Sequence, residues 1–568
     1  MKAGKWLSLI LAVAMVVSLA ACGGGGNTTP STGATGGQES QAPATQAPAT
    51  QAPSTQAPQS EAPSTEPAPP EDTLSGTITV SFIARSGMEE ALKRVAEGYE
   101  KLHPNVDVVI DLKADEGYYE WVTTVANSEN PDVDIAEFYH GDVWSLDLMD
   151  FSDYIDLDSP YTDGTWGEQF NPAGQLYSAA TQKMDRLAFF STQVIWMYNK
   201  DIFEEVGVEV PQTWDELIDI CEKIQAAGYQ PVALGGDYDS INMTHVAWLS
   251  RIYNDQVTRS LVKTWHAQEG DFCYDPDIDA DWEYDPTDPY NDTEDHMSYN
   301  ILRVMNSILD GTWRFDSPGQ KTVWTNFLRL FPKYCGGDAM FGLSTGGATT
   351  LFNQGKAAMT VNLSGAVAEF DRMMKEVEEY GFFTNADGEE VEGSVFNLGT
   401  FNMPSMEGEG VEAKARTIAG YVLDFSALNK DQDHNELVVD FLMYFSSPEG
   451  MSLYLDGLMD GGGSVDGPTY VYNVEYPEEL AGKFDDIEDI GGAQHGYAYA
   501  FASGVPYIDE SMREFYNDVY ALLSESIDVD EFLKRYEDNI LTYAPALCGA
   551  LNISEKDLEN PAAAPAGN

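Results

Sequence analysis

The clearest pattern of apolar and polar positions lies between residues 194 and 234. The apolar run Val194–Tyr198 predicts a buried strand. Thr213, with Glu216 three residues later, predicts a helix start with a capping box. Apolar residues then recur at the spacing of one helix face: Trp214, Leu217, Ile218, Cys221 and Ile224. Gly228 closes this helix and Pro231–Leu234 predicts the next strand, so the segment is a strand–helix–strand unit of an α/β domain.

The chain before this unit alternates in the same way. Strands are predicted at 76–84, 105–112 and 133–138, and helices at 89–103 and 118–128. Such alternation is typical of a mostly parallel sheet covered by helices on both faces. Ligands of these sheets bind beyond the carboxyl ends of the strands. This rule nominates the loops Arg85–Glu89 and Tyr139–Asp142 as ligand-binding loops.

The second half of the chain repeats these elements. A helix ending at Gly355 leads into a buried strand, Met359–Asn362, and a second strand covers 419–428. Helices are predicted at 435–446, from Ser447 onward, and between about 510 and 543. Aromatic residues, Tyr507 among them, mark the loops before the last helices. Residues 546–568 are expected to form a C-terminal tail.

The N-terminus has the pattern of a targeting segment. Lys2 and Lys5 precede the apolar run Leu7–Val17, which is too short to span a bilayer. Residues 19–22 read Leu-Ala-Ala-Cys, which resembles a bacterial lipobox. We therefore expect residues 1–21 to be a lipoprotein signal peptide and Cys22 to carry a lipid. An ordinary secretory signal with an incidental cysteine is the alternative.

Residues 22–75 have the composition of a tether. They contain the repeat QAPAT-QAPAT-QAPST-QAP and show no apolar periodicity. Such a segment cannot bury enough surface to offset its ordering entropy, so we expect it to be disordered. It would hold the folded part away from a membrane, and a protease-sensitive spacer without further role is equally compatible.

Composition and charge narrow the function. The 568 residues are 43% hydrophobic, which is enough for two or more domains or one two-lobed body. Lys+Arg number 30 against 94 Asp+Glu, giving a formal charge of −64. Nucleic acids and anionic membrane surfaces attract positive patches, so this balance argues against both as partners.

The cysteines show no metal or redox spacing. Cys221, Cys273, Cys335 and Cys548 are far apart in the sequence, and a disulfide between two of them remains open. Cys221 falls on the apolar helix face and is expected in the core.

An acidic stretch covers residues 275–296. An EF-hand starting at Asp275 would need Gly at position 280 and Glu at position 286, where the chain has Ala280 and Pro286. A solvated acidic loop is therefore favoured over a calcium site, which stays an alternative.

Three motifs carry a resemblance to a known family. They are YNKDIFEEVGVEVPQTWDELIDICEKI from Tyr198, LFNQGKAAM from Leu351 and YFSSPEG from Tyr444. In this order, after a lipobox and tether, they resemble the extracellular solute-binding proteins of carbohydrate ABC importers, the family 1 subgroup similar to maltose-binding protein. The resemblance covers about residues 76–545.

This resemblance implies a periplasmic-binding-protein-like fold of type II, with two α/β lobes joined by a hinge. Lobe one would hold 76–190 plus 415–460, and lobe two 191–405 plus 465–545. The ligand would lie between the lobes, which close on it.

The resemblance also implies ligand contacts. The implied residues are Ser86, Glu89, Tyr139, His140, Asp142, Phe190, Thr192, Trp248, Asn362, Ser364 and Tyr507. Many family members carry a stacking tryptophan in the turn after GKAAM. Here that turn reads Asn362-Leu-Ser-Gly-Ala366 and lacks it, a departure that bears on which sugar binds.

The expected function follows from the family. We expect a monomeric protein at the extracellular face of a bacterial, Gram-positive membrane, anchored through Cys22, that binds a carbohydrate and delivers it to ABC permease subunits. No cofactor, metal or catalytic residue is implied. Another small solute, a sensor subunit, or an extracellular carbohydrate-active enzyme using acids such as Glu89 and Asp142 are the alternatives.

Overall fold

The computed structural model describes residues 74–138, 146–178, 183–293, 296–386, 388–488, 490–492, 501–505 and 508–565. The expected signal peptide, lipidated Cys22 and tether lie outside these ranges. So do four of the expected contacts: Tyr139, His140, Asp142 and Tyr507. Within the described ranges, every helix is too short or too polar to cross a membrane.

The central sheet is mixed and has the strand order β2-β1-β3-β11-β5-β7-β6. The strands are β1 Gly76–Ile83, β2 Val106–Lys113, β3 Ile135–Ala136, β4 Gln175–Ser178, β5 Lys183–Asn199, β6 Gln230–Ala233, β7 Ala357–Leu363, β10 Leu398–Phe401 and β11 Ala419–Ala427. Pairs β1–β2, β1–β3 and β6–β7 are parallel, whereas β11 and β5 pair antiparallel with their neighbours. Each end of the sheet is thus parallel, and two antiparallel strands join the ends. The expected α/β class is confirmed.

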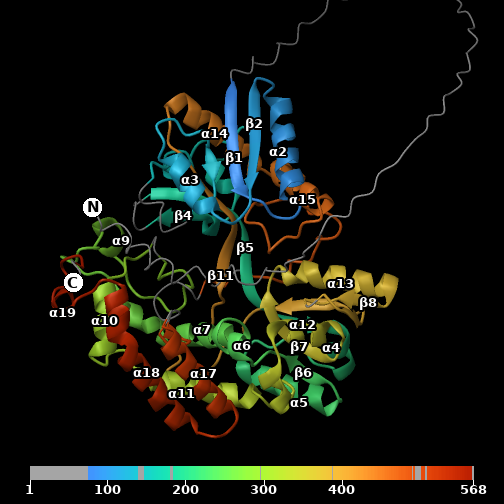
Figure 1. The fold of residues 1–568 in the computed structure, drawn as a ribbon, viewed down its shortest axis with the longest axis vertical. Coiled ribbons are helices and arrows are strands. Elements are labelled where there is room, and N and C mark those ends of the chain that lie inside the picture. The colour runs from blue at the N-terminus through green and yellow to red at the C-terminus, as the bar shows by residue number, and fades with distance from the viewer. Residues whose placement is uncertain are drawn as a thin grey trace, which may run out of the picture.

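The β1 end of the sheet carries one group of helices, which we call body one (Figure 1). They are α2 Met88–Leu102, α3 Tyr118–Ala126, α14 Gln432–Phe445 and α15 Pro448–Asp460. Helix α15 packs directly on α2: a Cβ on Gly457 would lie 2.6 Å from the Cα of Ala91. Only glycine permits this approach. The chain therefore returns from the other end of the sequence to complete body one.

The β6–β7 end carries the remaining helices, which we call body two (Figure 1). They are α4 Lys200–Val206, α5 Trp214–Ala226, α6 Tyr238–Asn242, α7 His245–Thr258, α8 Val262–Trp265, α9 Pro276–Asp279, α10 Ile301–Leu309, α11 Pro318–Leu330, α12 Thr345–Asn353, α13 Ala366–Tyr380, α17 Asp509–Leu523, α18 Val529–Ala550 and α19 Glu555–Leu558. A small hairpin, β8 Phe382–Thr384 with β9 Glu390–Glu392, follows α13. Short 3₁₀ turns cover Phe151–Asp153, Trp166–Gln169, Pro172–Gly174, Arg259–Leu261 and Gly337–Gly342.

Helix α5 forms as its sequence predicts. The Thr213 side chain accepts from the Glu216 amide, and the Glu216 carboxylate accepts from the Thr213 amide, which completes the capping box. Trp214 and Cys221 are buried, and the Trp214 indole donates to the Asn326 carbonyl at 3.1 Å. Both residues belong to the core of body two, as expected.

Three segments run side by side between the bodies. Strands β5 and β11 pair from Ala419 opposite Gln193 to Phe425 opposite Leu187. A third segment, 466–470, lies along β5, where the Ser191 amide donates to the Pro468 carbonyl at 2.9 Å. We call these three segments the crossing segments. They connect body one to body two (Figure 1).

Three expected elements differ from the structure. The strand expected at 194–198 is only the end of the 17-residue β5, because the residues before it, although polar in part, continue the same ladder. The strand expected at 133–138 shortens to Ile135–Ala136. The tail expected at 546–568 is wrong at its start: α18 continues to Ala550, and Leu547, Leu551 and Ile553 are buried in the core of body two. The expected boundaries of the two lobes stay a prediction.

Candidate ligand-binding site

Polar side chains meet where β1 and β3 end. Arg85 follows β1, and its Nη1 lies 2.6 Å from Oε1 of Glu137, which follows β3. The Ile83 amide donates to the other Glu137 oxygen at 3.0 Å. The side chain of Glu137 is 7% exposed and that of Arg85 38% exposed, so the arginine reaches outward from a buried carboxylate. Burial raises the pKa of Glu137, and the charge of Arg85 opposes that rise.

Two further carboxylates come from the crossing segments. Asp424 lies in β11, and its Oδ2 is 3.5 Å from Nη1 of Arg186 in β5. Asp466 lies in the third crossing segment. Burial raises the pKa of both, while the positive charge of Arg85 acts on each in the opposite direction. Arg85 pairs with Glu137, and its positive charge also acts on Asp424 and Asp466. We call these four residues the Arg85 cluster.

Aromatic residues border this cluster. Burial raises the pKa of Tyr119 and of Tyr454, and the positive charge of Arg85 opposes the rise in both. Tyr119 is half-buried, whereas Tyr454 is 3% exposed and packs on Phe190 with ring centroids 5.8 Å apart. Tyr454 is therefore packed in the interior, whereas part of the Tyr119 side chain stays accessible.

The residue before Asp424 has an unusual backbone. Leu423 has φ of 51°, a left-handed conformation that costs a branched-chain residue roughly 1–3 kcal/mol. It is also 3% exposed, so packing holds it in place. Strain of this kind collects at functional sites and hinges. Leu423 lies in β11, which connects the two bodies, and directly precedes Asp424 of the Arg85 cluster.

The cluster has the chemistry of a site for a polyhydroxylated ligand. Carboxylates accept hydrogen bonds from hydroxyl groups, an arginine donates several, and charged partners make these bonds stronger. Among the described residues, no three His, Cys, Asp or Glu side chains lie close enough together to hold a metal ion.

The expected contacts of body one lie beside the cluster. Ser86 follows Arg85 directly, and its hydroxyl donates to the Gly462 carbonyl at 2.9 Å. Glu89 is exposed in the first turn of α2. Both are therefore near the carboxyl end of β1, as the sheet rule expects.

The expected contacts at the crossing segments are more buried. Phe190 is 3% exposed and packs on Tyr454 of α15. Thr192 is 9% exposed and pairs with Gly420. In body two, Trp248 is 4% exposed and packs in the core, with its ring 5.8 Å from that of His245. These placements give Phe190 and Trp248 a packing role.

Ser364 and Asn362 lie at the carboxyl end of β7. The Ser364 hydroxyl accepts from the Gln193 amide at 3.0 Å and donates to the Asp466 carbonyl at 3.0 Å. Its own amide donates to the Gln193 carbonyl at 2.7 Å. Asn362 is half-buried and accepts from the Leu363 amide. Ser364 therefore joins two crossing segments to β7.

Sequence reasoning missed Glu137, Asp424 and Asp466. Glu137 is two residues before the nominated loop Tyr139–Asp142, so the sheet rule came close to it. Nothing in the sequence brings residues 424 and 466 to this edge, because only the return of the chain through the crossing segments does so.

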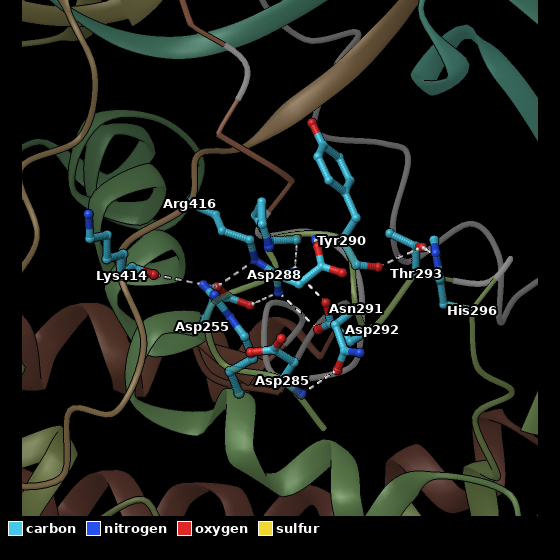
Figure 2. A network of polar contacts seen from close by, with 12 residues as sticks. Asp255, Asp285, Asp288, Tyr290, Asn291, Asp292, Thr293, His296, Lys414 and Arg416 are labelled. Atoms are coloured by element: carbon cyan, nitrogen blue, oxygen red, sulfur yellow. Dashed lines mark hydrogen bonds and ion pairs between the residues drawn. The ribbon is translucent and has the colours of Figure 1, made fainter. Parts of the chain in front are cut away.

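A buried arginine holds the part of the acidic stretch that the structure describes continuously, residues 275–293. Figure 2 shows Arg416 between Asp255 of α7 and Asp292 of the stretch. Its Nη2 lies 2.6 Å from Asp255 and 3.0 Å from Asp292, and its Nη1 donates to the Pro289 carbonyl at 2.8 Å. Arg259 also binds Asp255, at 2.9 Å.

The favoured interpretation as a solvated loop is thus wrong for part of this stretch. Asp279 and Asp292 are 3% and 2% exposed, and Asp279 lies 3.0 Å from His266. Their partners are side chains from elsewhere in body two, which the local sequence does not reveal. The four described cysteines, Cys221, Cys273, Cys335 and Cys548, are free thiols.

Comparison with known proteins gives one family. Residues 85–296 match the model of the bacterial extracellular solute-binding proteins. A multiple sugar-binding protein of Streptococcus mutans serotype c is 27% identical over 166 residues, which span 27% of this chain and 35% of that relative. The apo form of RafE from Streptococcus pneumoniae shares the fold with a TM-score of 0.50 at 17% identity, over 83% of this chain and 99% of that chain.

The matched segment contains β3, β5 and β6 and begins at Arg85, the centre of the cluster. The similarity to RafE extends over most of the described fold. Residues 85–296 are therefore similar to the bacterial extracellular solute-binding proteins, and the likeness to RafE is one of fold.

Proposed function

We propose that this chain is the extracellular substrate-binding protein of an ABC transporter and that its ligand is a sugar or oligosaccharide. The observation that carries the proposal is the Arg85 cluster at the carboxyl ends of β1 and β3, beside the crossing segments. The family match and the sugar-binding relative support it.

The chemistry of the cluster suits a sugar. The hydroxyl edge of a pyranose donates to and accepts from charged partners, and its C–H face packs on aromatic rings. Glu137, Asp424 and Asp466 supply acceptors, Arg85 supplies donors, and the half-buried Tyr119 supplies a ring. Excess acid over base in this cluster disfavours phosphorylated or acidic ligands.

Capture would proceed by hinge closure. A ligand that contacts both bodies binds the closed arrangement more tightly and shifts the population toward it. The strained Leu423 in β11 supports a hinge in the crossing segments. The lobes would be 76–190 plus 415–460 and 191–405 plus 465–545.

The finer features of the proposal rest on the sequence. They are a lipid at Cys22, a tether over 22–75, a place at the extracellular face of a Gram-positive membrane, permease subunits as partners, a monomeric state and no catalytic activity. Ser86, Glu89, Thr192, Asn362 and Ser364 remain candidate contacts. So do Tyr139, His140, Asp142 and Tyr507, which lie outside the described residues.

A thermal-shift screen with neutral mono- and oligosaccharides tests the proposal. A ligand at about 100 times its Kd adds roughly 2.7 kcal/mol to stability, which raises Tm measurably. Arg85→Ala is expected to abolish the shift while Arg372→Ala, which removes an exposed arginine on α13, retains it. If no saccharide shifts Tm, or if labelled saccharides are hydrolysed, the proposal is wrong.

A further inference from the structure

Residues 470–488 continue the third crossing segment and follow β5 from its middle to its end. The Tyr470 amide donates to the Phe189 carbonyl, in the middle of β5, at 2.9 Å. Near the other end of the segment, Asp486 lies 3.6 Å from Nζ of Lys200, the first residue after β5. We call residues 470–488 the strap. It therefore contacts the hinge strand at two separate places.

The first part of the strap is fixed by hydrogen bonds. The Tyr472 amide donates to the Gln169 carbonyl at 2.9 Å. The Glu475 amide donates to the hydroxyl of Ser452, in α15 of body one, at 3.1 Å. These bonds join uncharged groups, so dissolved salt has little effect on them.

The second part of the strap is fixed to body two by an ion pair. Nζ of Lys483 lies 2.6 Å from Oδ1 of Asp371 in α13, and the two side chains are 32% and 19% exposed. Lys375, one turn further along α13, lies 3.1 Å from the other oxygen of Asp371. Burial favours protonation of Asp371, but the two lysines hold its pKa below the usual value. Asp371 is thus a charged anchor that the strap and the helix share.

The chain between these two attachments has slack. The segment from Glu475 to Lys483 could extend to roughly 25 Å at about 3.3 Å per residue. Instead it is folded into turns, in which the Leu480 amide donates to the Pro477 carbonyl and the Lys483 amide to the Leu480 carbonyl. The strap therefore limits movement through its contacts and not through its length.

Apolar side chains flank the ion pair. Leu480 and Phe484 are 1% and 7% exposed and belong to a core that also contains Phe370 and Met373 of α13. Apolar burial is not directional, so it holds the strap down without fixing its position. The pair of Lys483 with Asp371 supplies that position.

We propose that the strap is a latch that holds body two at one position relative to body one, and that the pair of Lys483 with Asp371 makes this latch sensitive to ionic strength. Salt weakens a half-exposed ion pair by screening its charges. Movement between the two bodies is then smallest at low salt. The inference concerns the hinge and stands whatever the ligand is.

The experiment measures the distance between the two bodies. Spin labels are attached to Leu102→Cys at the end of α2 and Tyr380→Cys at the end of α13, which are 50% and 58% exposed in the parent. The full mature chain carries Cys22→Ser and Cys273→Ser, which remove a terminal and a partly exposed thiol. Double electron–electron resonance gives the distance distribution at about 20 mM and about 500 mM NaCl.

The test variant is Lys483→Met, and the matched control is Lys375→Met. Both remove one lysine from Asp371, but only Lys483 belongs to the strap. Lys483→Arg is a second control, because it keeps a cation on the strap.

Lys483→Met is expected to at least double the width of the distance distribution at low salt, and high salt should broaden that of the parent in the same way. Lys375→Met and Lys483→Arg should keep the narrow distribution at low salt. Equal distributions for Lys483→Met and Lys375→Met, or a parent that does not respond to salt, overturn the inference. Because no ligand is added, neither result bears on the proposed function.

Discussion

At the scale of the residue, the raised pKa values of the carboxylates in the Arg85 cluster make binding sensitive to pH. Burial raises the pKa of Asp424 above its usual value near 3.9, against the opposing charges of Arg186 and Arg85. Sugar affinity should therefore weaken as pH falls from neutrality toward this raised pKa, because a protonated carboxyl is a weaker acceptor. Isothermal titration calorimetry from neutral pH downward measures the change.

Protonation of the same carboxyl has the opposite effect on the stability of the fold. A carboxyl with a raised folded pKa takes up a proton more readily in the folded state, so the free energy of unfolding gains from its protonation as pH falls. Weaker binding with an intact thermal transition thus separates titration of the site from acid unfolding. Asp424→Asn should bind at least about tenfold less tightly at pH 7 and with a flatter pH profile, and an unaltered affinity would remove Asp424 from the site.

A second residue-scale prediction concerns Glu525, which follows α17. Its φ is 57°, in the left-handed region that glycine adopts without strain, and the side chain is exposed. Glu525→Gly should raise the free energy of unfolding by about 0.5–1 kcal/mol, measured by urea denaturation. Ser524→Gly is the control: its φ of −87° relieves no strain, and an equal gain there would contradict the explanation.

At the scale of the element, Ser364 connects β7 to two crossing segments through one hydroxyl. Ser364→Ala leaves the Gln193 amide and the Asp466 carbonyl without this partner in a buried place. We expect a loss of about 1–3 kcal/mol in the free energy of unfolding. Ser464→Ala, an exposed serine nearby, should change stability by less than about 0.5 kcal/mol. Equal effects of the two variants would mean that the hydroxyl is not a structural link.

At the scale of the whole molecule, Arg416 links the acidic stretch to the start of β11. It is 1% exposed and binds two buried carboxylates, Asp255 and Asp292 (Figure 2). Arg416→Met leaves the carboxylates of Asp255 and Asp292 buried without the guanidinium of Arg416. We expect a loss of about 3–5 kcal/mol in the free energy of unfolding. Asp292→Asn added to Arg416→Met should recover part of that loss, because it removes one of the uncompensated charges.

Arg372→Met serves as the control for Arg416→Met, since Arg372 is exposed and pairs along its own helix.

The ion pairs of Asp255 also predict that stability is sensitive to acid. Burial favours protonation of Asp255, but Arg416 and Arg259 hold its pKa below the usual value. Its contribution to stability is present above the unfolded pKa of about 3.9 and is lost as pH falls through the folded pKa. Acid titrations of Tm that match between parent and Arg416→Met would contradict this.

The elements were largely predictable because their signals are local. The capping box at Thr213, the apolar face of α5 and the glycine after α12 each depend on residues within one or two turns. The length of β5 was not predictable, because its ladder partners lie more than 200 residues away in β11. The tail was mistaken because the residues that bury Leu547 and Ile553 come from distant helices.

The sequence by itself determined the α/β class, the resemblance to solute-binding proteins and the loop that begins at Arg85, since periodicity, motif order and strand ends are properties of short segments. Only the tertiary structure decided on which carboxylates the charge of Arg85 acts. Asp424 and Asp466 reach it through the crossing segments, and Arg416 reaches the acidic stretch through the base of β11. Long-range pairing brings together charges that are separated by hundreds of residues, and burial then sets their pKa values. No local pattern records either effect.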